Sequence, residues 1–244
     1  MAERVAADAL PAGFLAREAA WSLDALVVAI ATAVLTWTTV AGALATLRQA
    51  WRHLQEVAAA RMAEALSQVA DPAALVSRLL GDPAMHAAAA AVESTAYRVL
   101  LPPLLVFAAL AAAYWIGFER SAWQATPGKR ALALQVTDLQ GHRLDLPRAA
   151  ARHVAGALSW LTFNLGHALA AVPPHKRALH DYIAGTRVVH GDGQPRLPGW
   201  AKAWVALQLL LAVGLPGWLA LRYAAGLQAA LLQANLLQAN LLRG

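Results

Sequence analysis

Long apolar runs alternate with polar segments along the chain, and these runs predict its principal helices. Residues 22–47 carry only one formal charge, Asp24, and residues 99–118 carry none. A third run, at 203–221, lies between flanking basic residues and contains a Gly-Leu-Pro-Gly segment at 214–217, which predicts a kink or a break. About 20 apolar residues in a helix cross a bilayer. The pattern therefore predicts transmembrane helices at 22–47, 99–118 and 203–221.

Composition and tryptophan placement support membrane insertion. Hydrophobic residues make up 59% of the chain and charged residues 14%, which excludes intrinsic disorder and argues against a purely water-soluble protein. Indole rings prefer the headgroup region. Most of the nine Trp residues lie near the ends of the runs: Trp21, Trp51, Trp115, Trp123, Trp200, Trp204 and Trp218.

The distribution of charge predicts the topology. Segment 119–152 has six Lys or Arg against three Asp or Glu, and segment 173–202 has five against two, whereas 48–98 is balanced. The positive-inside rule places the N-terminal segment 1–21 and both basic segments in the cytoplasm. The Ala-rich 48–98 is then an extracytoplasmic loop of two or three short amphipathic helices. No cleavable signal peptide is evident, so the first span is predicted to be retained.

Segment 119–190 is predicted to form a small cytoplasmic β-motif interrupted by a membrane-associated stretch. Residues 132–138 and 142–146, joined by a turn at Gly141, predict a β-hairpin, and 185–190 predict a third strand. Between them, 152–172 is amphipathic, with a polar stripe. That stretch is predicted to be re-entrant or interfacial, with a third membrane helix as the alternative. The polar stripe contains His153, Asn164 and His167.

Two C-terminal segments complete this organisation. Residues 191–202 are predicted to be a basic linker, and 222–244 a low-complexity helical tail with a repeated Leu-Leu-Gln-Ala-Asn unit, which we interpret as a packing segment of an oligomer. The fold class is therefore mainly α: a helical integral membrane protein with a small cytoplasmic β-hairpin or three-strand element. The pI near 10.3 is explained by basic loops, so no nucleic acid is expected.

Four motifs in order resemble the RDD family, over 11–47 and about 97–190. They are Pro11 to Asp24, Thr126-Pro-Gly-Lys129, 134–141, and Arg177 to Val189 with its His180-Asp181 pair. The resemblance implies a multi-pass domain of the bacterial inner membrane, mostly of unestablished biochemistry, for which transport has been suggested. By motif position it implies that the naming residues are Arg17, Asp24 and Asp181.

These residues allow two chemical interpretations. Asp24 lies inside an apolar run, where an unpaired charge costs about 3 kcal/mol or more. Arg17 is seven residues earlier and on the same helix face, so the guanidinium is predicted to approach Asp24 directly or through Asp181. The set is either an ion or proton site or a salt-bridge latch. His180 is either coupled to Asp181 in a proton path or a loop histidine bonded by its neighbour.

The remaining candidates are polar surface residues. Lys129 and Arg130 are predicted to lie in a turn at the anionic lipid surface. His153, Asn164 and His167 line either a polar groove or the membrane interface. No metal site, cofactor or enzyme signature is evident.

Two functions follow from these residues. One is a small-solute or cation/proton transport module, which with so few spans requires a homo-oligomer in the lipid bilayer. The other is a non-transporting membrane scaffold that binds partners.

Overall fold

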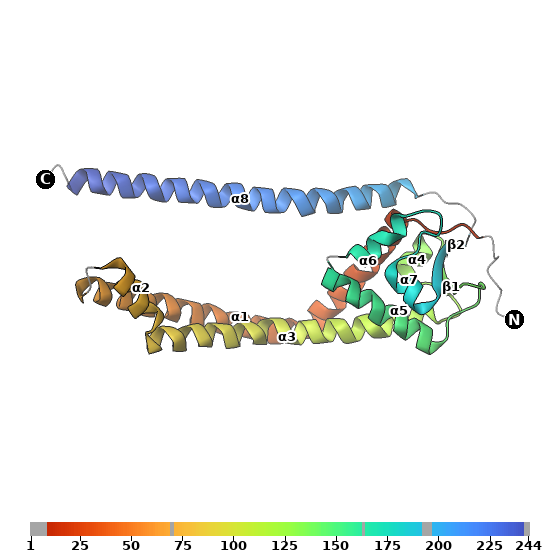
Figure 1. Cartoon of the computed structure of the whole chain (residues 1–244), viewed down its shortest axis with the longest axis horizontal. Coiled ribbons are helices and arrows are strands. Elements are labelled where there is room, and N and C mark those ends of the chain that lie inside the picture. Colours follow the sequence, from red (N-terminus) through yellow and green to blue (C-terminus); the bar gives the residue numbers. More distant parts are fainter. Residues whose placement is uncertain (1–8, 69–70, 163, 192–196, 242–244) are drawn as a thin grey trace.

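The computed structural model places a compact module at one end of three long helices (Figure 1). It describes residues 9–68, 71–162, 164–191 and 197–241. The long helices are α1 (Phe14–Gln68), α3 (Pro83–Glu119) and α8 (Gly199–Leu241). We use "compact module" for residues 9–21 and 119–191, which lie together at the end where α1 and α8 begin.

Helices α1 and α3 form an antiparallel hairpin closed by the short helix α2 (Pro72–Leu80). The two Asp-Pro pairs fix this turn, because the carboxylates of Asp71 and Asp82 cap α2 and α3. At 1.5 Å per residue, α1 is about 80 Å long, far more than the roughly 30 Å of a hydrocarbon core. The prediction of two or three short helices over 48–98 is therefore wrong: α1 and α3 continue through most of it, and only α2 is short.

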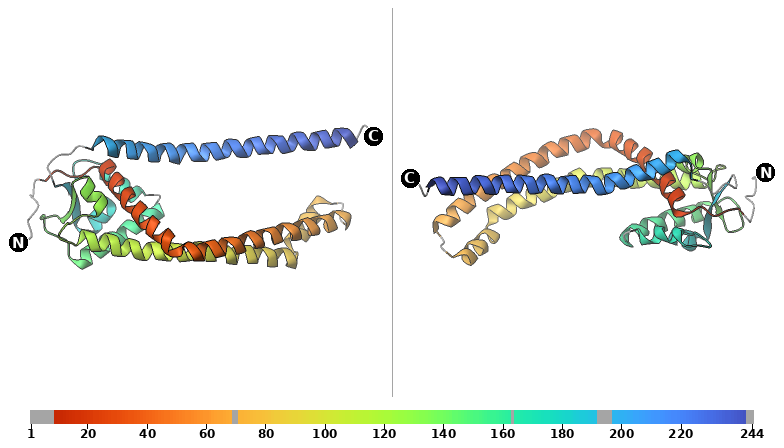
Figure 2. Two further views of the ribbon diagram at one scale, coloured as in Figure 1. Left: turned by 180° about the vertical axis from the view of Figure 1, so that it is seen from behind. Right: turned by 90° about the horizontal axis from the view of Figure 1, so that it is seen from above.

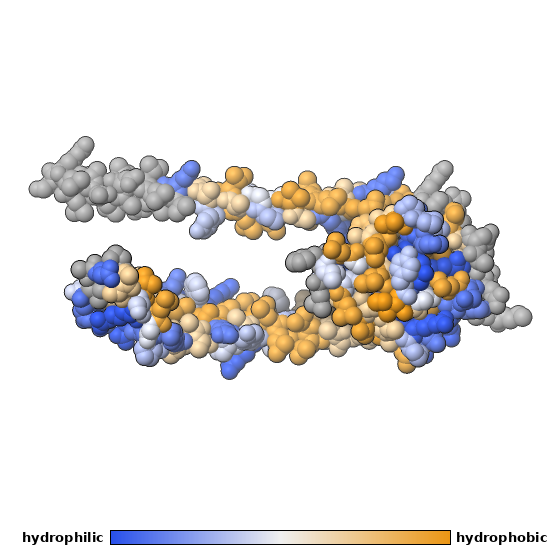
Figure 3. Space-filling model, viewed as in Figure 1, coloured by the Kyte–Doolittle hydropathy of each residue, from blue (hydrophilic) through white to orange (hydrophobic). Residues whose placement is uncertain are grey.

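Apolar contacts join the hairpin near the compact module. Val28 on α1 packs with Ala111 and Trp115 on α3. The three long helices are each long and apolar enough to cross a membrane. Figure 3 shows apolar residues over the middle of the hairpin and along the first half of α8, with polar residues around α2. This is the mainly helical membrane architecture that the sequence predicts.

Helix α8 contacts the rest of the chain near its first turns and then runs beside the hairpin at a distance (Figure 2). Both Trp204 and Gln208 donate hydrogen bonds to the hydroxyl of Ser22, at 3.0 and 3.1 Å. The helix continues without interruption through Pro216, so the predicted break at 214–217 is absent. It also includes most of the predicted tail, whereas 192–196 of the predicted linker and the last residues, 242–244, lie outside the described residues.

Among the described residues the sheet has two strands, not the predicted hairpin plus a third strand. Strand β1 (Leu134–Asp138) pairs antiparallel with β2 (Thr186–His190), in the register Val136 opposite Val188. Residues 142–145 form no strand. The N-terminal segment borders β2 instead: Pro11 forms a bridge with Val189, and the Ala12 amide donates to the Val188 carbonyl at 2.9 Å.

Small residues allow α1 to approach this sheet closely. Four alanines on the first turns of α1 and just before them are buried, and they pack against the inward side chains of both strands. The buried residues of this core include Ala12, Ala16, Ala19, Ala20, Leu134, Val136 and Val188.

The amphipathic stretch 152–172 is broken into short helices and not one continuous helix. These are α5 (Leu146–Leu158), the 3₁₀ turns Ser159–Thr162 and Leu169–Ala171, and α6 (Leu165–Ala168). None is long enough to span a bilayer, so the alternative of a third membrane helix here is not what the structure has. Its apolar side chains are nevertheless exposed: Val154, Leu158, Trp160, Leu165, Leu169 and Val172. The interfacial placement stays a prediction.

Candidate functional site

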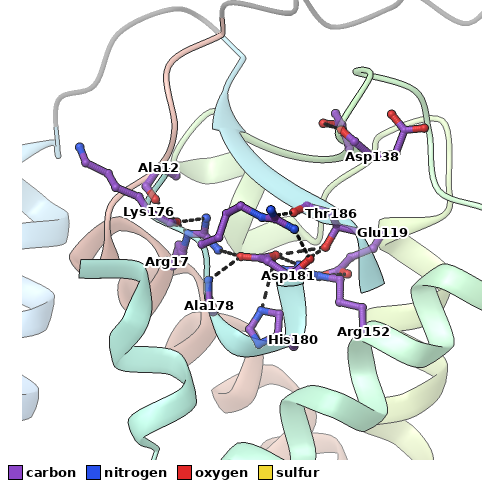
Figure 4. A network of polar contacts seen from close by, with 12 residues as sticks. Ala12, Arg17, Glu119, Asp138, Arg152, Lys176, Ala178, His180, Asp181 and Thr186 are labelled. Carbon is purple, nitrogen blue, oxygen red and sulfur yellow. Dashed lines mark hydrogen bonds and ion pairs between the residues drawn. The ribbon is translucent and has the colours of Figure 1, made fainter. Parts of the chain in front are cut away.

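Asp181 is the centre of a buried ion-pair network (Figure 4). It lies in the first turn of α7 (Leu179–Ala184), and its side chain is 0% exposed. One carboxylate oxygen accepts from Arg17 at 2.5 Å and from the Ala178 amide at 2.9 Å. The other accepts from Arg152 and from the Thr186 hydroxyl, at 3.2 Å for the latter. The carboxylate therefore meets two guanidinium groups and two neutral donors.

Arg17 connects two segments that are far apart in the sequence. Besides Asp181, its guanidinium donates to the carbonyl of Ala12 at 2.9 Å and to the carbonyl of Lys176 at 2.6 Å. The planar guanidinium presents its donors in a fixed fork, which suits this arrangement. Arg17 thereby fastens the start of α1 to the segment leading into α7.

Arg152 extends the network to α3. It donates to Glu119 at 2.9 Å, and Glu119 accepts from Lys129 of α4 (Pro127–Ala131), also at 2.9 Å. The charges alternate along the chain Lys129, Glu119, Arg152, Asp181, Arg17, all nearly buried. Three cations and two anions leave one excess positive charge. The network joins α1, α3, α4, α5 and α7.

Asp181 and Arg152 hold each other in their ionised forms. Burial alone raises the pKa of Asp181, but Arg152 and Arg17 outweigh it and hold that pKa well below its usual range. Burial lowers the pKa of Arg152, and the two carboxylates Asp181 and Glu119 reverse that effect and raise it. Asp181 and Arg152 are therefore both charged near neutral pH.

His180 adjoins this network in its neutral form. Burial, reinforced by Arg152, lowers the pKa of His180 to about 3, and its ring nitrogen is 3.8 Å from Asp181. The His167 ring stands 5.0 Å away, between centroids, and burial lowers the pKa of His167 too. Buried ring nitrogens of both histidines lack hydrogen-bond partners among the described residues. Because His180 is neutral near pH 7, it cannot act as an acid that transfers a proton to Asp181.

Asp24 occupies a separate site on α1 and has only neutral partners. Its carboxylate accepts from the Tyr114 hydroxyl at 2.8 Å, the Thr126 hydroxyl at 2.5 Å and the Gly128 amide at 2.7 Å. The residue is 1% exposed. Within the described part of the chain, Asp24 forms no ion pair, with Arg17 or with any other cation.

The Thr-Pro-Gly sequence is shaped to receive this carboxylate. Thr126 caps α4, Pro127 takes the first helical position, and Gly128 then comes close to α1. A Cβ on Gly128 would lie 2.3 Å from the Ala20 carbonyl oxygen and 2.9 Å from Asp24. Only glycine fits here without displacing the backbone.

The structure separates several residues that the sequence groups together. Arg17 and Asp181 form an ion pair, but Asp24 contacts neither of them and is bound at a separate site on α1. Lys129, predicted at the lipid surface, is instead buried against Glu119. Its neighbour Arg130 is exposed and lies over the Trp123 ring at 4.3 Å.

The predicted polar stripe is likewise divided. His153 stacks on Trp115 with 6.4 Å between ring centroids, whereas His167 faces His180. Asn164 is exposed at the start of α6, where its backbone adopts the left-handed conformation with φ of 63°. The chain therefore does not keep the single helical face on which the stripe was based.

Four residues of the two sites carried no role in the sequence interpretation. Arg152 and Glu119 border apolar stretches, and a charge in that position is a usable signal for a buried ion pair. Tyr114 and Thr186 give no such signal: the partner of Tyr114 is 90 residues away, and a threonine hydroxyl near Asp181 does not mark an ion-pair site by itself.

Comparisons with known proteins agree with the motifs. The sequence model described as the RDD family matches residues 11–185. The chain is also 34% identical over 90 residues to "Uncharacterized protein YxaI" of Bacillus subtilis (strain 168). That alignment covers 37% of this chain and 59% of the relative, so the chain spans about three fifths of the relative's length. No solved structure matches.

Proposed function

The chain belongs to the RDD family, and from this premise we propose that it is a non-transporting membrane scaffold of the bacterial inner membrane. In this proposal Arg17, Asp24 and Asp181 are structural latches that hold the compact module against the membrane hairpin. The module then presents a fixed cytoplasmic surface to partner proteins. No catalytic role is proposed for any residue.

The saturation of the signature side chains carries this proposal. The Arg17 guanidinium has three acceptors, the Asp181 carboxylate has four donors, and the Asp24 carboxylate has three. The long-range bonds among these join segments of the module to each other or to α1, and the Tyr114 bond joins α1 to α3. Buried charges that are completely paired favour a unique geometry, which is what a latch requires.

A second candidate function, cation or proton exchange at Asp24, has one observation in its favour. Asp24 is a buried acid without an ionic partner in the described residues, near the start of a membrane span. The hydroxyls of Tyr114 and Thr126 are oxygen ligands that suit a hard cation as well as a carboxylate. Transport would also require a homo-oligomer, because three spans enclose little space.

An Asp24→Asn substitution tests the proposal against this alternative. Asparagine keeps the shape of the side chain but replaces one accepting oxygen with an amide NH2 group, a donor that would face the hydroxyl and amide donors. For a latch we expect the module to loosen, so that limited proteolysis cuts residues 139–145 faster, while proteoliposomes of the wild type show no cation-dependent proton flux. The matched control is Glu93→Gln, an exposed acid on α3.

The outcomes of this experiment are distinct. A wild-type flux that disappears in a folded, protease-resistant Asp24→Asn protein overturns the scaffold and supports exchange. If neither flux nor a change in cleavage rate is found, Asp24 is not part of the latch. If cleavage is faster in Asp24→Asn but not in Glu93→Gln, the latch proposal is supported.

A further inference from the structure

A cleft lies where the starts of α1 and α8 meet the compact module. It has a volume of about 500 Å³ and is lined mainly by apolar side chains, with two lysines and the buried His190 as its polar side chains. The residues that matter here are Phe14, Leu15, Leu197, Ala170, Lys176 and Lys202. None of them belongs to the Asp24 or Asp181 contacts through its side chain.

The two lysines bring positive charge to the cleft from different segments. Lys176 precedes α7, and its backbone carbonyl is fixed by Arg17 at 2.6 Å. Figure 4 shows the Lys176 side chain pointing away from the ion-pair network. Lys202 is on the first turn of α8 and is exposed. In the residues that the structure describes, neither ammonium group has a carboxylate partner.

The cleft lies at the level expected for lipid headgroups. Lys202 stands between Trp200 and Trp204 at the beginning of the apolar part of α8, and indole rings mark the membrane interface. Leu15 is 54% exposed beside it. Acyl or glycerol carbons can therefore contact the apolar wall while a phosphate meets the lysines.

We infer that this cleft binds the headgroup of an anionic phospholipid. The phosphate lies between Lys176 and Lys202, and the upper part of the lipid packs on Phe14, Leu15 and Leu197. The excess positive charge of the adjacent ion-pair network adds to the attraction. This inference does not depend on whether the chain is a scaffold or a transporter.

Lipid titrations of the full chain in neutral detergent, followed by native mass spectrometry, test the site. The probes are phosphatidylglycerol, phosphatidylcholine and inorganic phosphate. We expect phosphatidylglycerol to bind preferentially. Because a lysine near an anionic surface contributes about fivefold in binding, Lys176→Gln with Lys202→Gln should weaken phosphatidylglycerol binding about 25-fold. The single variants should each give the smaller loss, which keeps the test usable if the double variant does not fold.

The control removes the same charge from another part of the module. Arg120 and Arg143 are exposed and do not line the cleft, so Arg120→Gln with Arg143→Gln should leave phosphatidylglycerol binding unchanged. Equal loss in the control, or equal binding of phosphatidylcholine, overturns the site. Competition by inorganic phosphate at the same concentration as the lipid overturns the lipid assignment in favour of a free-anion site.

Discussion

Asp24 and Asp181 are equally buried but are stabilised in different ways. Asp181 faces two guanidinium groups, and its charge is balanced by ions. Asp24 faces two hydroxyls and one amide, and its charge is balanced only by dipoles among the described residues. Both carboxylates fasten α1 to segments more than 80 residues away in the sequence.

The difference has a consequence for how each site fails. Removing one member of a buried ion pair leaves the others uncompensated, which is expensive. Removing one neutral donor from a carboxylate costs about the value of a single hydrogen bond. The Asp181 network should therefore break as a unit, whereas the Asp24 site should weaken in small steps.

The largest effect is expected from Asp181→Asn. It leaves Arg17 and Arg152 buried without their shared anion, so we expect a loss of about 3–5 kcal/mol in the free energy of unfolding. Thermal or denaturant unfolding in detergent measures it. Asp24→Asn should cost less, about 1–3 kcal/mol. Equal losses for the two variants would contradict the distinction between ionic and dipolar compensation.

Coupling between sites gives a sharper form of the same test. Arg17→Gln combined with Asp181→Asn should cost less than the sum of the single losses, because the two groups contact each other. Arg17→Gln combined with Asp24→Asn should be close to additive. Strong coupling in the second pair would restore the Arg17–Asp24 contact that the sequence suggested.

Acid pH should act on the Asp181 region through His180. The pKa of His180 is about 3 in the folded chain and about 6.5 when unfolded, so the unfolded state binds the proton more readily. The stabilisation is therefore complete above pH 6.5 and is lost as pH falls toward 3, by about 3 kcal/mol at pH 4. The free energy of unfolding, measured at pH 7, 5.5 and 4, should decrease at each step.

The groups around His180 explain its sensitivity and supply the controls. Burial is the main cause of the lowered His180 pKa; Arg152 and His167 lower this pKa further, whereas Asp181 and Glu119 raise it. His180→Gln should flatten the slope between pH 6.5 and 4. The exposed His175, replaced by Gln, should leave the slope as it is in the wild type. A wild-type slope in His180→Gln would assign the acid sensitivity to another group.

Gly128→Ala should disturb the Asp24 site by overpacking. The new methyl group would meet the Ala20 carbonyl at 2.3 Å, and overpacking of this kind costs about 1–3 kcal/mol. Gly117→Ala is the matched control on α3, since nothing lies within 4 Å of its added Cβ and alanine favours the helix. Thermal unfolding of the two variants should therefore shift in opposite directions.

The sequence predicted the membrane helices and the meeting of Arg17 with Asp181, but not the partner of Asp24. Apolar runs report directly on membrane spans, and the motif order identified the signature residues. Two residues seven positions apart on a helix, such as Arg17 and Asp24, share a face but are about 10 Å apart along the axis, which is too far for easy contact. Asp24 instead reaches Thr126 and Gly128, for which the local pattern gives no signal.

The sheet shows a similar limit. The turn at Gly141 exists, with φ of 85°, but the Asp138 carboxylate accepts from the amides of Gln140 and His142 and so competes with a hairpin ladder. The partner of β1 comes from about 50 residues later, and the N-terminal segment occupies the other edge of β2. Alternation identifies strands, and long-range packing selects which of them pair.

The smallest effect is expected from Tyr114→Phe, which removes one neutral donor from Asp24 and keeps the ring. The ring packs edge-on against Trp115 and Phe118, at 5.3 and 4.9 Å between centroids, so packing should persist. We expect a loss of about 1 kcal/mol in the free energy of unfolding, measured by thermal unfolding beside Tyr97→Phe, whose tyrosine is 61% exposed. A loss as large as that of Asp181→Asn would mean that the hydroxyl supports Asp24 as strongly as a cation does. The distinction between ionic compensation at Asp181 and dipolar compensation at Asp24 would then be wrong, because Thr126 and Gly128 without the Tyr114 hydroxyl could not stabilise the Asp24 charge.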